Sequence, residues 1–134
     1  MATTRTATST KRPGMLAYEE SVGLPFNEIV TRLRERLGVK LVAYIGNVGS
    51  TRPVSAWADG TRSPGQLDEQ RLRTAYQIAG TLGERYTATT TQTWFRGLNP
   101  ALDYTAPARM LREQDPGDVG AQLLAAASSF AYVG

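Results

Sequence analysis

The sequence predicts an all-α fold. Apolar residues recur at spacings of three and four over most of the chain, as they do on the buried face of a helix. No run of five or six residues alternates apolar and polar side chains convincingly enough to demand a strand. Gly and Pro stand between the periodic segments, where helices begin or end. With 134 residues, the chain suits one compact domain or two small helical lobes.

The N-terminal part of the chain is expected to be a mobile basic tail, which we assign to residues 1–20. Residues 1 to about 14 are rich in Thr and have no apolar periodicity, so little burial would offset the entropy of ordering them. A solvated leader is the preferred interpretation of this tail, and an arm that contacts nucleic acid is the alternative. No apolar stretch follows the basic residues, so we expect no secretory signal and a cytoplasmic protein.

Four helices are predicted between residues 21 and 86, which we treat as one domain. The first runs from Phe26 to Leu37, with Asn27 or the preceding turn as its start and Gly38 as its end. Two short helices follow, over residues 40–45 and 51–58. Ser50 or Thr51 can cap the second of them, Pro53 suits its first turn, and Gly60 can end it. The fourth helix spans residues 67–86.

Residues 87–134 are predicted to form a C-terminal domain of three helices. The first covers residues 89–96 and ends before the Gly-Leu-Asn-Pro breaker at 97–100. The second covers residues 105–113, with Pro107 in its first turn, and the third covers residues 118–132.

The composition argues against an enzyme. The chain has neither Cys nor His, which excludes thiol nucleophiles, Cys/His zinc sites and Ser-His-Asp triads. Its carboxylates occur as neighbours or at helix starts, where solvated or capping roles are more common than catalysis. We therefore expect a binding module without cofactor or metal. The formal net charge of +3 weakly favours an anionic partner.

The two short helices and their turn have the layout of a helix-turn-helix. Aligned on Trp57 and Gly60, this segment resembles the Xre/Cro class of DNA-binding proteins. The resemblance departs from the class at Tyr44 and Val48, where Ala and Gly are usual. It implies that DNA is contacted by side chains of the second helix and the loop after it, namely Thr51, Arg52 and Ser55 at base edges and Arg62 at a phosphate. A helix-turn-helix kept as a scaffold or dimer surface is the alternative.

A second resemblance lies in Trp94 to Glu113, WFRGLNPALDYTAPARMLRE. This segment is similar to the C-terminal toxin-binding domain of the Xre/MbcA/ParS antitoxin family. That domain has a Trp-led helix, an Asn/Pro break, a Leu, and a Pro that opens a helix with paired apolar residues, followed by a Val-led helix. Here the matching positions are Trp94, Leu98, Asn99, Pro100, Leu102, Pro107, Met110, Leu111 and Val119. One departure is Ser129, where the family commonly has Gly.

This resemblance implies a type II antitoxin that binds a RES-domain toxin and covers the active site with which the toxin destroys NAD. A homodimer or a hetero-oligomer with the toxin, and autoregulation through operator DNA, would accompany that role. Spacing indicates that Trp94, Leu98, Leu102, Leu111 and Val119 belong to the core. The candidate toxin contacts are Phe95, Arg96, Asn99, Arg109, Arg112, Phe130, Tyr132 and Val133, since aromatic and Arg side chains commonly anchor interfaces.

Two other interpretations remain open at this point. A stand-alone Xre-class transcriptional regulator would use residues 87–134 only to dimerise, and the basic tail favours it. A structural or assembly protein with an incidental Xre-like fold is the third possibility. The match over residues 94–113 favours the antitoxin.

Overall fold

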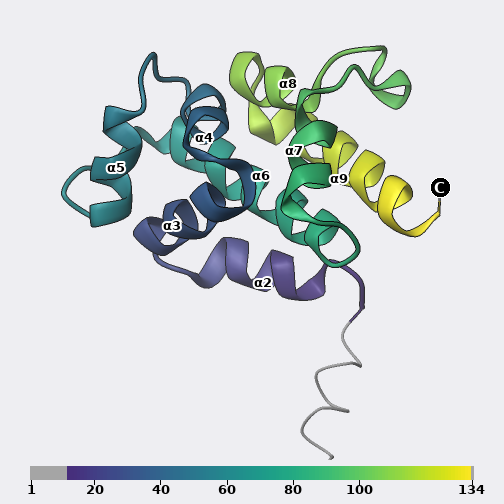
Figure 1. The fold of residues 1–134 in the computed structure, drawn as a ribbon, viewed down its shortest axis with the longest axis horizontal. Helices are drawn as coiled ribbons and strands as arrows, with labels where there is room; N and C mark the ends of the chain where they lie inside the picture. The colour runs from purple at the N-terminus through teal and green to yellow at the C-terminus, as the bar shows by residue number, and fades with distance from the viewer. Residues whose placement is uncertain (1–11, 134) are drawn as a thin grey trace, which may run out of the picture.

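The computed structural model describes residues 12–133, and these residues are all-α, as the sequence predicts (Figure 1). One 3-10 turn, η1, interrupts the helices in the C-terminal part. The elements are α2 Met15–Gly23, α3 Phe26–Leu37, α4 Val39–Ile45, α5 Arg52–Asp59, α6 Gln66–Gly83, α7 Ala88–Arg96, η1 Pro100–Leu102, α8 Pro107–Glu113 and α9 Pro116–Tyr132. Among the helices of residues 12–133, none combines the length and the apolar character needed to cross a bilayer.

The longest helix, α6, is the axis around which the other helices pack. It contacts α2, α3, α4, α7, α8 and α9 (Figure 1). Helices are usually apolar along one stripe, but contacts on several sides require buried residues around much of the circumference. The buried residues of α6 are accordingly Arg71, Leu72, Ala75, Tyr76, Ile78, Ala79, Thr81 and Leu82.

The core runs continuously through the two domains expected from the sequence. Buried side chains from Ile29 in α3 to Ala131 in α9 belong to one cluster. The expected domain boundary near residue 86 falls between α6 and α7. However, α6 packs against helices from both expected domains, α2, α3 and α4 before the boundary and α7, α8 and α9 after it. Arg71 adds a polar link, because its buried Nε donates to the carbonyl oxygen of Leu111 at 2.7 Å.

Residues 15–20 belong to a packed helix, so the expectation of a tail over 1–20 is wrong for this part. Ala17 and Ser21 of α2 are buried, and α2 contacts α6. The close approach depends on Gly80, because a Cβ atom there would lie 2.7 Å from the Cβ of Ala17. Arg73 of α6 also donates to the carbonyl oxygens of Ser21 and Leu24, at 2.9 and 3.0 Å. Residues 1–11 of the expected tail lie outside the described residues.

The α4–α5 pair packs against α3 and buries the predicted side of α5. Val54 and Trp57 are buried, and the Trp57 ring meets the Phe26 ring edge-on at 6.2 Å. Gly60 ends α5 with a φ of 80°, a conformation that glycine adopts readily. The expected cap is absent: Thr51 is the residue before α5, its backbone is helical, and no side-chain hydrogen bond caps the helix. A capping side chain needs an extended backbone at that position, which explains the difference.

Replacing Trp57 should destabilise the whole fold. Its ring is 3% exposed and fills the junction between α3 and α5. We expect Trp57→Ala to lower the free energy of unfolding by about 3–5 kcal/mol in urea denaturation. Tyr18→Ala is the control, because Tyr18 is 51% exposed on α2, and it should change stability by less than about 0.5 kcal/mol. An equally small effect of Trp57→Ala would contradict burial of the ring.

Candidate partner-binding surfaces

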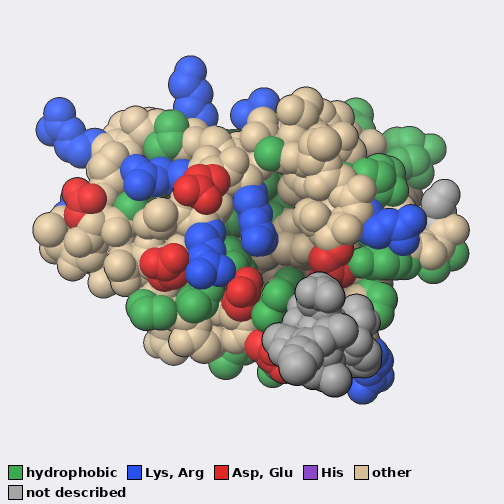
Figure 2. All heavy atoms as spheres, turned by 60° about the horizontal axis from the view of Figure 1, so that its bottom comes forward, with side chains coloured by type: hydrophobic (Ala, Val, Ile, Leu, Met, Phe, Trp, Pro, Cys, Tyr) green, Lys and Arg blue, Asp and Glu red, His purple; other side chains and the backbone are tan. Residues whose placement is uncertain are grey.

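Apolar side chains are exposed where α9 ends. Leu98 is 72% exposed, Phe130 41%, Tyr132 37% and Val133 84%. Leu98 and Phe130 line one groove of about 290 Å³, together with Trp94 and Pro100. We call Leu98, Phe130, Tyr132 and Val133 the C-terminal apolar surface. Figure 2 shows hydrophobic side chains gathered at this end of the molecule, whereas charged side chains of both signs alternate over the middle of the same face.

The loop that carries Leu98 has a fixed shape. The Asn99 side chain accepts a hydrogen bond from the backbone N–H of Ala101 at 2.9 Å, and its backbone pairs with Thr105. Asp103 and Tyr104 both have positive φ, 57° and 60°, which turns the chain back sharply. Leu102 is buried and anchors the loop to the core. Asn99 therefore shapes the surface rather than extending from it.

The end of α9 is held by residues at the end of α6. The phenol of Tyr132 donates to the Glu84 carboxylate at 2.6 Å, and the Arg85 guanidinium lies over the Tyr132 ring at 5.1 Å. The Glu84 carboxylate also accepts from the backbone N–H of Gly14, before α2. Tyr86 packs its ring against Phe130 with the centroids 5.0 Å apart. The terminal turn of α9 is thus oriented before any partner binds.

Two of the sequence-based assignments in this region are wrong. Phe95 was expected at the interface, but it is fully buried and its ring meets Trp94 edge-on at 5.4 Å. Leu98 was expected in the core, but Gly97 ends α7 before it and leaves it outside. Of the other predicted core residues, Trp94, Leu102, Leu111 and Val119 are buried.

The predicted toxin-contacting arginines lie at a different place, beside α4. Lys40, Tyr44, Arg96 and Arg109 line a hollow of about 290 Å³ between α4, α7 and α8. A second hollow, of about 510 Å³, shares Lys40 and Tyr44 with the first and is lined in addition by Arg112. We call these five residues the basic groove. None of the residues that line the groove of the C-terminal apolar surface lines either hollow.

The predicted DNA-contacting residues are all exposed. Thr51 and Arg52 are exposed at the start of α5, Ser55 is exposed one turn further along it, and Arg62 lies in the loop that follows. Val54 and Trp57 occupy the buried side of the same helix. An amphipathic helix with this division can present its polar side to a groove of DNA.

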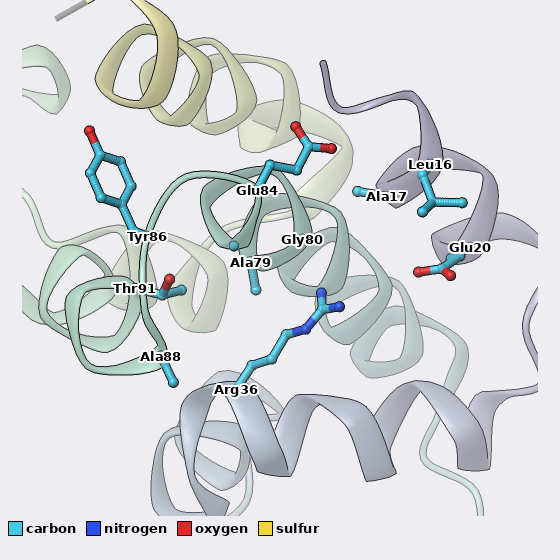
Figure 3. A pocket seen from close by; sticks show the side chains of 11 residues that line it. Leu16, Ala17, Glu20, Arg36, Ala79, Gly80, Glu84, Tyr86, Ala88 and Thr91 are labelled. Atoms are coloured by element: carbon cyan, nitrogen blue, oxygen red, sulfur yellow. The ribbon is translucent and has the colours of Figure 1, made fainter. Parts of the chain in front are cut away.

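A further hollow, of about 330 Å³, lies between α2, α6 and α7 (Figure 3). Arg36 points into it toward Gly80, and its buried Nη1 has no hydrogen-bond partner among the described residues. The Arg36 guanidinium lies over the Tyr76 ring at 5.1 Å. Glu20 and Glu84 also line the hollow, but their carboxylates already accept bonds from Tyr76 and Tyr132. The hollow thus has charges of both signs, unlike the basic groove.

The contact between Tyr132 and Glu84 should be visible in a titration. The hydrogen bond to the Glu84 carboxylate, aided by partial burial, raises the pKa of Tyr132 above its ordinary value of 10.0. The folded state therefore favours the protonated phenol, and the contact is complete below about pH 10 and lost as the pH rises through the pKa of Tyr132. We expect Glu84→Gln to lower the pKa of Tyr132 in an NMR titration of labelled tyrosines. Glu113→Gln, on α8, should leave that pKa unchanged; equal effects of the two variants would contradict the contact.

Comparison with known proteins gives one informative match. Neither the scan of family models nor the search of curated proteins finds a match. The fold is similar to a chain in the crystal structure of the M. tuberculosis MbcT-MbcA toxin-antitoxin complex, with a TM-score of 0.61 and 28% sequence identity. The match covers 80% of this chain and 96% of that chain. The protein therefore has the fold of a component of a toxin-antitoxin complex.

Proposed function

We propose that this protein is the antitoxin of a type II toxin-antitoxin pair and inhibits its toxin by direct binding. The observation that carries the proposal is the structural match to a chain of the MbcT-MbcA complex over nearly the whole of that chain. The match includes sequence identity of 28%, so it reflects more than a shared arrangement of helices. The absence of Cys and His from the chain agrees with a protein that binds an enzyme rather than acts as one.

The C-terminal apolar surface is the proposed contact with the toxin. Leu98 and Val133 are mostly exposed, and an apolar surface of this kind gains free energy when a partner covers it. Phe130 and Tyr132 add aromatic rings, which commonly anchor interfaces. Both rings are already oriented by Tyr86, Glu84 and Arg85, so less conformational entropy is lost on binding.

The proposed toxin is a RES-domain enzyme that degrades NAD, and the proposed complex is a hetero-oligomer in the cytoplasm. This part of the proposal is supported by the resemblance of residues 94–113 to the Xre/MbcA/ParS family. The C-terminal apolar surface would lie against or near the entrance through which NAD reaches the toxin. The antitoxin would then act by exclusion, and the chemistry would belong to the toxin.

Co-expression with the product of the adjoining gene tests this proposal. We expect the two proteins to co-purify as a complex and the purified toxin to consume NAD only when the antitoxin is absent. An adjoining product that neither binds this chain nor consumes NAD would overturn the assignment of the toxin. A stand-alone regulator would bind DNA and leave NAD consumption unchanged.

Polar substitutions on the apolar surface should weaken inhibition without unfolding the protein. We expect Leu98→Ser/Val133→Ser to weaken toxin inhibition at least tenfold, about 1.4 kcal/mol, while the melting temperature stays nearly constant. These two side chains are the most exposed of the surface, so the fold does not depend on them. Tyr18→Ser/Val22→Ser is the matched control, because both residues are exposed on α2. Equal inhibition by the two double variants would refute this surface.

A second proposed function is binding of operator DNA through α5. Arg52 and Ser55 are exposed on the side of α5 opposite the buried Trp57, and Arg62 follows the helix. This arrangement suits a helix that enters the major groove, and a DNA-bound antitoxin could regulate its own operon. Homodimerisation would place two such helices on successive turns of DNA.

Arg52 allows the two functions to be separated. We expect Arg52→Ala to weaken binding to the cognate duplex by about 1–3 kcal/mol, because it removes a donor to a base edge. Inhibition of the toxin should be unaffected, because Arg52 lies on α5 and outside the C-terminal apolar surface. Fluorescence anisotropy with cognate and scrambled duplexes measures the change. Equal losses on both duplexes would contradict a role in base recognition.

A further inference from the structure

We infer that the basic groove binds the phosphate backbone of duplex DNA beside the base pairs read by α5. This inference rests on the proposed DNA-binding function and extends it to α7 and α8. Lys40, Arg96, Arg109 and Arg112 would contact phosphates, although the sequence alone suggests these three arginines as toxin contacts, because Arg commonly anchors interfaces. The groove would thus enlarge the positively charged surface that contacts DNA, since α5 itself has only one Arg.

The charges in the groove are not neutralised within the protein, with one exception. No carboxylate of the described residues forms an ion pair with Lys40, Arg96 or Arg112, and no acidic side chain lines either hollow. The exception is Arg109, whose Nε donates to the Glu113 carboxylate at 3.1 Å in an exposed pair. Clustered positive charges of this kind attract a polyanion and release its counterions on binding.

The groove is continuous with the proposed DNA-reading helix. Ser50 and Thr51, directly before α5, line the same hollow as Lys40 and Arg112. Their hydroxyl groups are suited to hydrogen bonds with phosphate oxygens. A DNA strand that passes the start of α5 would therefore lie near Lys40 and Arg112. Contacts of this kind position a protein on DNA without reading its sequence.

Arg112 is oriented for this role by α4. Its Nη1 donates to the carbonyl oxygen of Tyr44 at 2.7 Å, and its guanidinium lies over the Tyr44 ring at 4.8 Å. Neither contact removes its positive charge, and the remaining N–H groups stay available to a phosphate. The side chain is thus held in place before DNA binds, which lowers the entropy cost of a contact.

The position of the groove favours DNA over an acidic surface of the toxin. The C-terminal apolar surface lines a separate groove with no residue in common. By contrast, Thr51 is one of the predicted DNA-contacting residues and also lines the hollow that contains Lys40 and Arg112. A toxin that binds both surfaces is the competing occupant, and it would make toxin inhibition depend on the basic groove.

The test compares two double variants that each remove two positive charges. Lys40→Gln/Arg96→Gln changes exposed residues of the groove, and Arg32→Gln/Arg34→Gln changes two residues of α3, outside it. DNA binding is measured by anisotropy at several salt concentrations, with a duplex from upstream of the gene and a scrambled duplex. We expect the groove variant to bind both duplexes about tenfold more weakly and to lower the slope of log K against log salt by about two. The control variant should have a smaller effect than the groove variant on both the affinity and the salt slope.

Three results would overturn the inference. In the first, the unmodified protein binds DNA and Arg52→Ala loses discrimination between the duplexes, but the groove variant has an unchanged salt slope. This result would reject DNA binding by the groove and would support DNA binding by α5. Weakened toxin inhibition by the groove variant with intact DNA binding would assign the groove to the toxin. No salt-dependent binding of the unmodified protein to either duplex would reject the DNA-binding function and the groove together. Circular dichroism of each variant verifies that it is folded.

Discussion

The structure depends on the burial of α6 by the helices around it. Leu72, Tyr76, Ile78 and Leu82 are all fully buried, and α6 contacts α2, α3, α4, α7, α8 and α9. Helices from both halves of the chain pack against α6, so the two halves share one hydrophobic core. The helix α5 is attached to this core through α3 and α4, and the C-terminal apolar surface is attached to it through α7 and α9. Both proposed functions therefore act on surfaces whose positions are set by the same packing.

The main helices could be predicted because their burial is local in sequence. Residues 26–37 and 66–83 have apolar side chains at helical spacing, and the structure has helices at both places. The helix α2 could not be predicted this way, since it buries only the small residues Ala17 and Ser21. Its attachment depends on Gly80, Arg73 and Glu84, which are distant in sequence. A segment without an apolar stripe in its sequence can therefore still form a packed helix, if its buried face consists of small residues.

The candidate sites were harder to predict because exposure depends on neighbours that the sequence does not reveal. Trp94 and Phe95 are adjacent in α7, and one of them would be exposed on a helix with a single buried face. Both are buried, because α7 packs against α3, α6 and α8. The exposure of Leu98 has a local signal, since Gly97 ends the helix directly before it. The grouping of Lys40 with Arg109 and Arg112 has no such signal, because only the contact of α4 with α8 creates it.

The carboxylate of Glu84 connects the two ends of the described chain. Glu84 accepts bonds from the N–H of Gly14 and from the phenol of Tyr132, so the start of α2 and the end of α9 share one partner on α6. A terminal turn without such contacts would fray, and a partner would have to order it on binding. Here the ordering is already supplied by intramolecular contacts. The rings of Phe130 and Tyr132 can therefore act as oriented anchors, and their contribution to a complex is reduced less by lost conformational freedom.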